Sequence, residues 1–394
     1  MSVSKKFTIK KYKRELYQSF KSLSLKFSDY YPVNYVFNNL EIFEDIYRGS
    51  SGVDFASKLI IDDAGSVVGF RGAIPAKVQI PLSGGEYEIV ESVSLTGWLL
   101  DPDRDDVAGL GSKLNLSYFS EYAVVTGVST GQFAEKMFEV AGGCSDPGMR
   151  RWVIPLESAG YLALCGSNHE AVDAVLRSCS TATATDSVEK PNFEITDVEL
   201  AALWERVSSF RPILGTYRDA AYWKWRYLNC SYYEYLVFGD PDDSGVIIGR
   251  LDTVVDEGMS AVSGLKVFRI IELLPNTSAA WNGLLDESFE VLLRATLAWA
   301  RGAGAVAADF HMSTDLFNQL LTNVGFLTQN HQYGPPEASL AGLFRPFRLR
   351  PSLINFAWSV NQKLISKKMA DQFEVYLVKS DGAGDRPKIW PDYE

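Results

Sequence analysis

The sequence predicts an α+β protein made of two tandem copies of one domain, each a mixed, mostly antiparallel sheet flanked by helices. Three observations support this prediction. The chain has 394 residues, which is too long for one ordinary domain. A hairpin pattern occurs twice along it, and a strand–helix pattern occurs twice at almost the same separation. Hydrophobic residues make up 46% of the chain, which is ordinary for a globular protein with a large core.

The first repeated block is a β-hairpin. Residues 58–72 read KLIIDDAGSVVGFRG, in which an Asp/Gly turn separates two β-rich runs. Residues 235–251, YLVFGDPDDSGVIIGRL, repeat this pattern. Gly69 and Gly249 occupy matching positions and lie 180 residues apart.

The second repeated block is a short apolar strand followed by a helix. The strands are expected at 123–128 and 305–310, and the helices at 130–142 and 313–325. Each helix opens with Ser or Thr and closes with Gly, the residue types that cap helix ends. The two closing glycines are 183 residues apart. Two repeats in the same order at nearly one offset indicate a duplicated domain.

A stretch poor in large apolar residues separates the copies, and this composition predicts a linker. The predicted division is a first domain at 1–177, a linker at 178–191 and a second domain at 192–394. Each copy is expected to hold one long strand, Tyr87–Leu100 in the first and Leu265–Leu274 in the second, and the tail one more strand at 373–379.

The bulk properties exclude several classes of function. The formal net charge of −11 disfavours a nucleic-acid or anionic-membrane surface. Four cysteines without a C-x-x-C pair and only three histidines disfavour a metal site. The sequence holds no apolar run of about 18 residues and no signal-like start. We therefore expect a cytoplasmic protein without membrane insertion. No pattern indicates an oligomeric state.

The segment richest in chemical information is WLLDPDRDDVAGLGSKLNL, residues 98–116, in which a strand ends and a helix begins after a short loop. The first N–H groups of a helix have no acceptor within the helix, and the positive end of its dipole lies behind them. Gly109 and Gly111 would let a ligand approach this backbone closely. Such a helix start can bind a pyrophosphate. The other interpretation is a helix start packed through small residues.

This segment resembles the coenzyme A loop of the GNAT (GCN5-related) acyltransferases, Gln/Arg-x-x-Gly-x-Gly/Ala after a strand, with Asp106 in the first position. The resemblance implies a GNAT fold in each copy, with acyl-CoA as donor; no metal is expected, given the cysteine and histidine counts above. The matching stretch of the second copy, 275–285, lacks the glycine spacing, so the first copy is the expected coenzyme A domain. The implied cofactor contacts are Trp98, Leu99, Leu100, Arg104, Val107, Ala108, Gly109, Leu110, Gly111, Ser112 and Lys113.

Acyl transfer to an amine needs a neutral nucleophile, so a general base is expected. By the same resemblance Glu91, on the first long strand, is a candidate, and Glu272 is its counterpart on the second. His311 is a second candidate because it directly follows the strand at 305–310, although a structural role is the alternative for it. Neither expected last helix contains the tyrosine that protonates the thiolate in many GNAT enzymes.

Residues 217–235, YRDAAYWKWRYLNCSYYEY, are rich in Tyr and Trp, which stack on rings, and hold arginines, which suit diphosphates. The W-R-Y element at 225–227 resembles tandem-GNAT proteins of surface-polysaccharide (lipopolysaccharide O-antigen) gene clusters. The resemblance implies that the protein transfers an acetyl or 3-hydroxybutanoyl group from coenzyme A to a dTDP-linked 3-amino-3,6-dideoxyhexose. The expected substrate contacts are Tyr222, Trp225, Arg226, Tyr227, Arg250 and Arg269. The alternative is aromatic packing, with the arginines paired to carboxylates.

The leading hypothesis is therefore an acyl-CoA-dependent N-acyltransferase acting on a nucleotide-linked amino sugar. Two alternatives stay open. One is a tandem-GNAT aminoacyl transferase that uses charged tRNA, which the acidic net charge disfavours. The other is a non-catalytic binding module in which both copies are degenerate.

Overall fold

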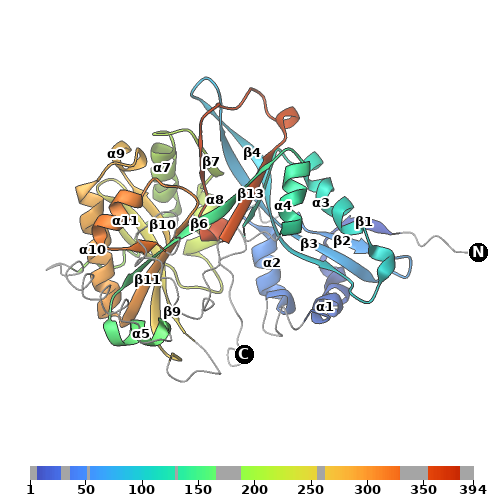
Figure 1. Ribbon diagram of the computed structural model, residues 1–394, viewed down its shortest axis with the longest axis horizontal. Helices are drawn as coiled ribbons and strands as arrows, with labels where there is room; N and C mark the ends of the chain where they lie inside the picture. The colour runs from blue at the N-terminus through green and yellow to red at the C-terminus, as the bar shows by residue number, and fades with distance from the viewer. Residues whose placement is uncertain are drawn as a thin grey trace, which may run out of the picture.

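The computed structural model describes residues 7–27, 36–50, 54–128, 132–165, 188–254, 262–328 and 354–381. The predicted α+β class is confirmed, because two mixed sheets are flanked by helices. Figure 1 shows the strands of the first half towards one end of the long axis and those of the second half towards the other. Most of the predicted linker, up to residue 187, lies outside the described residues, and the division into 1–177 and 192–394 stays a prediction.

The strands are β1 Thr8–Lys11, β2 Lys58–Ile61, β3 Val67–Pro81, β4 Tyr87–Leu100, β5 Val124–Val128, β6 Cys144–Pro155, β7 Ile213–Thr216, β8 Leu236–Asp240, β9 Gly245–Thr253, β10 Lys266–Pro275, β11 Ala305–Met312, β12 Leu327–Thr328, β13 Ile354–Val360 and β14 Glu374–Tyr376. The α-helices are α1 Tyr17–Leu25, α2 Leu40–Arg48, α3 Leu110–Glu121, α4 Gln132–Val140, α5 Ser158–Cys165, α7 Asp197–Ser208, α8 Ala220–Trp223, α9 Ser278–Trp281, α10 Glu287–Gly302 and α11 Asn318–Val324. A π-helix, η4, covers Lys224–Leu228, and short 3₁₀ turns include η2 Val36–Asn38, η3 Asp105–Val107 and η7 Lys379–Asp381.

Both predicted hairpins are present, β2–β3 and β8–β9. In the first, Asp62 Oδ1 accepts the N–H groups of Ala64 and Ser66, at 3.1 and 2.9 Å, and Gly65 has a φ of 83°. This turn therefore has the Asx-type chemistry that its sequence indicates. The long strands also lie where they were expected, β4 at Tyr87–Leu100 and β10 within one residue of its predicted limits.

The two halves of the chain exchange strands. The first residues of β6 pair with β13, for example Cys144 with Trp358, and its last residues pair with β11, for example Val153 with Asp309. β13, from the C-terminal part of the chain, lies between β5 and β6 in the first sheet. Figure 1 shows the green β6 crossing from one half to the other beside the red β13. Neither half of the sequence alone supplies all the strands of its sheet.

Helices cover both faces of the first sheet. Tyr118 of α3 and Phe138 of α4 share a buried cluster with Val93 of β4 on one face. On the other face, aromatic residues of α1 and α2, among them Phe43, pack on Leu99 of β4. Neighbouring residues of a strand point to opposite faces, so Trp98 points away from the cluster that contains Leu99.

A C-terminal segment, Glu374–Asp381, joins the two halves. Tyr376 and Val378 are part of the largest hydrophobic cluster, which packs α7 and α10 on the strands of the second sheet. Leu377, between them, instead packs with Met149 and Phe356 on the first sheet. Because its alternate side chains belong to different cores, the segment fastens one sheet to the other.

One fully buried arginine, Arg218, anchors this segment. Its Nε atom donates to Glu272 Oε1 at 2.9 Å, its Nη2 atom to Asp381 Oδ2 at 2.9 Å and its Nη1 atom to the Thr216 carbonyl at 2.7 Å. The guanidinium also lies over the Trp204 ring, 4.4 Å from its centroid. Nearby carboxylates, Asp381 foremost, raise the pKa of Arg218 and keep it charged despite burial.

The change Arg218→Met should destabilise the protein severely, because it leaves two buried carboxylates without their cation. We expect a loss of about 3–5 kcal/mol of unfolding free energy. Urea unfolding measures it through the transition midpoint. Lys368→Met, which removes the exposed partner of Asp371, is the control and should leave the midpoint unchanged. Equal midpoints for the two variants would contradict the anchoring role.

Candidate functional site

Strands β4 and β5 form a splayed pair in the first sheet. They run parallel and pair from Ser92–Val124 to Leu95–Gly127, and the pairing then stops. Residues Trp98, Leu99 and Leu100 of β4 still pair with β3 on one side. Within the described residues no strand pairs with them on the other side. A peptide-like ligand could add to this free edge through backbone hydrogen bonds.

A β-bulge lies where the strands separate. Leu95 pairs with Ala73 and Trp98 with Arg71, so two residues of β4, Thr96 and Gly97, face the single Gly72 of β3. A bulge bends its strand and increases the local twist. The bulge therefore turns β4 away from β5 and opens the splay.

The free edge of β4 leads to the start of α3. The N-cap residue Gly109 has a φ of 79° and provides no side-chain cap. A Cβ atom on Gly109 would have no atom within 4 Å, so this position is open to a ligand. On Gly111 a Cβ atom would lie 2.6 Å from Trp98 Cζ2 and 2.8 Å from Leu100 Cδ1. The second glycine thus lets α3 pack directly on β4.

The remaining residues of the predicted cofactor loop differ in exposure. Ala108, Gly109 and Lys113 are exposed, Leu110 and Ser112 are half-buried, and Val107 is buried in the core. Arg104 donates hydrogen bonds to Asp106 and Asp62, and these bonds, the one to Asp106 foremost, raise the pKa of Arg104. Its charge is thus balanced within the protein. The anion-attracting groups of the loop are the helix start and Lys113.

The second sheet also contains a splayed pair of parallel strands, β10 and β11, but its opening is filled. β10 and β11 run parallel up to Arg269–Asp309, and a bulge in β10 follows directly at Ile271. Here the C-terminal segment fills the opening. Val378 forms a bridge with Met312, and the Ser313 N–H donates to the Leu377 carbonyl at 2.9 Å.

The helix start beyond the second splay is also closed. Thr277 caps α9 by accepting the N–H of Ala280, and it donates to Asp286 at 2.5 Å. Asp286 in turn caps α10. The two copies are thus unequal: the first has an open splay and an uncapped helix, the second a filled splay and a capped one.

The structure separates Glu91 from the first splay. Glu91 is exposed and pairs across the sheet with Lys77 of β3. It lies four residues before Leu95, which is about 13 Å along an extended strand. Its predicted role as a general base stays untested, and its position gives that role no geometric support.

His311 lies within β11, which continues to Met312, so the prediction that the strand ends before this residue is wrong. The side chain is buried, with Nδ1 3.9 Å from Asp309 Oδ2. Asp309 also accepts from Arg151 at 2.9 Å and from Arg269 at 2.8 Å. These contacts favour the structural interpretation of His311, and its catalytic role stays a prediction.

The side chains predicted to bind the acceptor are directed to partners inside the protein. The Tyr222 hydroxyl donates to Asp381 at 3.2 Å and that of Tyr227 to Glu272 at 2.8 Å. Burial raises the pKa values of both tyrosines. Trp225 donates to the Asp45 carbonyl, Arg226 to Tyr232, Arg250 to Asp252, and Arg269 to both Asp252 and Asp309. Packing and ion pairing account for these six residues.

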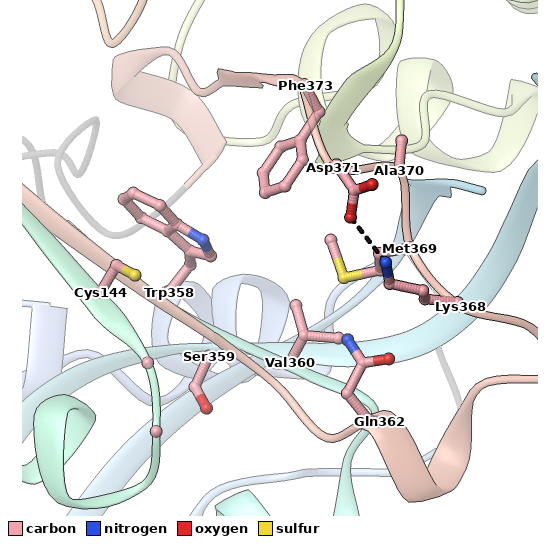
Figure 2. Close-up of a pocket in the computed structure, with 12 residues that line it drawn as sticks. Cys144, Trp358, Ser359, Val360, Gln362, Lys368, Met369, Ala370, Asp371 and Phe373 are labelled. Carbon is pink, nitrogen blue, oxygen red and sulfur yellow. Dashed lines mark hydrogen bonds and ion pairs between the residues drawn. The ribbon is translucent and has the colours of Figure 1, made fainter. Parts of the chain in front are cut away.

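A cavity of about 550 Å³ lies at the other end of β13 from the splay. Figure 2 shows Trp358, Phe373 and Met369 around it, with the Lys368–Asp371 ion pair at one side. Gly142 and Gly143, which follow α4, complete one wall. This cavity offers an apolar surface apart from the loop that follows β4.

Two further observations concern only the described part of the chain. None of its helices is long and apolar enough to cross a membrane. It contains no group of three or more His, Cys, Asp or Glu side chains arranged to hold a metal ion.

No protein-family model matches the sequence, and no curated protein matches it. Solved structures do match. Saccharomyces cerevisiae N-myristoyltransferase with bound myristoyl-CoA has a TM-score of 0.50 and 11% identity, over 89% of this chain and 78% of that one. A structure of the same enzyme with myristoyl-CoA and inhibitors has a TM-score of 0.52 and 9% identity. This match covers 93% of this chain and 87% of that one.

A third similar structure is a conserved Enterococcus faecalis protein of unknown function, described as a probable N-acyltransferase. Its TM-score is 0.50 and its identity 10%, over 90% of this chain and 72% of that one. At such identities these likenesses establish the fold. The GNAT-like fold expected from the sequence is confirmed over most of the chain.

The two loop glycines should respond differently to substitution. Gly111→Ala places a methyl group against Trp98 and Leu100 and should cost about 1–3 kcal/mol of unfolding free energy. Gly109→Ala meets no atom but keeps a left-handed φ, which costs about 1–2 kcal/mol.

Gly84→Ala, in a turn with open space and an ordinary φ, is the control for both variants. Urea unfolding compares all three. A Gly111→Ala protein as stable as Gly84→Ala would contradict the close packing of α3 on β4.

Proposed function

We propose that this chain is an N-acyltransferase that takes its acyl group from a coenzyme A thioester bound to the first sheet. The observation that carries the proposal is the open β4–β5 splay leading to the uncapped start of α3. The free edge of Trp98–Leu100 suits the amide-containing arm of coenzyme A, and the Gly109–Lys113 backbone suits its pyrophosphate.

Two further observations support this proposal. Two of the similar structures are of N-myristoyltransferase and hold myristoyl-CoA, and the third is described as a probable N-acyltransferase. The second splay of this chain is filled by its own C-terminal segment. We therefore propose one donor site per chain, in the first sheet.

The proposed reaction forms a C–N bond and breaks a C–S bond. A neutral amine attacks the thioester carbonyl, the tetrahedral intermediate expels the thiolate, and the proton lost by the amine balances the thiol that is released. Holding donor and acceptor together can supply much of the rate. No described side chain is assigned here as the general base.

Calorimetry with coenzyme A should give one site per chain, and Gly109→Asp should abolish binding. The new carboxylate would stand at the helix start and repel the pyrophosphate, besides adding a Cβ atom where φ is 79°. Gly283→Asp is the matched control, because Gly283 has a φ of 77° but follows the capped helix α9. Two sites per wild-type chain, or full affinity for coenzyme A in Gly109→Asp, would contradict a single donor site at the start of α3.

For the acceptor we propose, more narrowly, a nucleotide-linked amino sugar such as a dTDP-linked 3-amino-3,6-dideoxyhexose. This part rests on the sequence resemblance alone. The six side chains predicted to contact it have partners within the protein, so other groups would bind this acceptor.

Free-thiol release should accompany mixing of the protein, acetyl-CoA or 3-hydroxybutanoyl-CoA, and a dTDP-amino sugar. A chromogenic disulfide detects the thiol, and the same mixture with the amino group of the sugar already acetylated is the blank. Release with small peptide amines but not with any amino-sugar nucleotide would remove this acceptor class and keep the N-acyltransferase.

A further inference from the structure

The Trp98 side chain lies beside the free edge of β4, between the starts of two helices. On one side its indole approaches Gly111 of α3, where an added Cβ atom would be only 2.6 Å from Cζ2. On the other side its ring centroid is 4.9 Å from that of Phe133, in the first turn of α4. Since α4 follows β5, this contact joins a side chain at the free edge of β4 to the helix that comes after β5.

The Arg71 side chain fixes the position of this indole. The Arg71 guanidinium, opposite Trp98 across the β3–β4 pair, lies 5.7 Å from its ring centroid. Arg71 Nη1 also donates to the Thr96 carbonyl at 2.8 Å, which ties it to the bulge. The indole is thus held by a cation–π contact to a side chain that is itself anchored.

The polar atom of this indole has no partner. Trp98 Nε1 is buried and, among the described residues, has no hydrogen-bond acceptor. A buried donor without an acceptor costs about 1–3 kcal/mol, and buried donors in native proteins almost always have one. Phe133, whose ring covers the indole, is itself 50% exposed. An unsatisfied donor under an exposed aromatic ring, beside an open strand edge, indicates a ligand that supplies the acceptor.

We propose that the Trp98 indole N–H donates to an amide carbonyl of the coenzyme A arm, and that Phe133 covers the arm once it is bound. This inference rests on the proposed function and adds to it a side-chain contact for the donor. The arm has amide groups, which provide carbonyl acceptors, whereas the adenosine bisphosphate part of the cofactor lies towards α3 in this arrangement. Trp98 is therefore a positioning residue that recognises the arm.

The test is the variant Trp98→Phe, which keeps an aromatic ring and removes the N–H. Calorimetry should show binding of coenzyme A weakened about three- to tenfold, the range expected for one neutral hydrogen bond. Adenosine 3′,5′-bisphosphate, which lacks the arm, should bind Trp98→Phe and wild type equally. A general distortion of the loop would weaken both ligands, so the difference between them isolates the contact.

Trp358→Phe is the matched control, because Trp358 is also half-buried in the first sheet but lies on β13 at the cavity of Figure 2. It should leave the affinities for both ligands unchanged. Phe133→Leu should weaken coenzyme A and spare the bisphosphate, as Trp98→Phe does.

The outcomes separate the two proposals. If wild type binds coenzyme A and Trp98→Phe binds it equally well, the contact is refuted and the donor site stands. If Trp98→Phe loses affinity for both ligands alike, the residue is structural and the contact is again refuted. If wild type binds no coenzyme A, both proposals fail.

Discussion

The buried ion pairs of Arg218 are the interaction on which the asymmetry of this protein depends. Arg218 is fully buried, and its partners Glu272 and Asp381 come from β10 and from the C-terminal segment. Isolated charges in such a place would be very costly, so the three groups are stable only together. They keep the segment in the second splay, and that opening is consequently not available to a ligand. Of the two splays, only the one between β4 and β5 is open among the described residues.

The first splay is open because of backbone geometry. A two-residue bulge at Thr96–Gly97 turns β4, and Gly111 lets α3 pack on the strand that results. The same bulge geometry occurs at Ile271 in β10. The copies share the backbone distortion that opens a splay, and they differ in what occupies it. The N-cap residues mark this difference: Gly109 has no side chain to cap its helix, whereas the Thr277 side chain caps α9.

The sequence predicted local elements well and long-range pairing poorly. Hairpin turns and the strand Tyr87–Leu100 follow from local residue chemistry. The insertion of β13 beside β5 could not be predicted, because strand partners more than 200 residues apart leave no local pattern. Arg269 was predicted to bind a ligand for a similar reason, because its partner Asp309 lies 40 residues away and on another strand.

The strand exchange has a consequence for how the protein is made. β5, one wall of the open splay, receives its second neighbour only from residues 354–360. During synthesis the chain emerges from its N-terminus, and domains generally fold as soon as their residues are available. The outer edge of β5 therefore stays unpaired while roughly 225 further residues are added to the chain. An exposed strand edge is prone to pair with other chains. Ribosome-bound fragments of this protein are thus more vulnerable to aggregation than the length of either domain would imply.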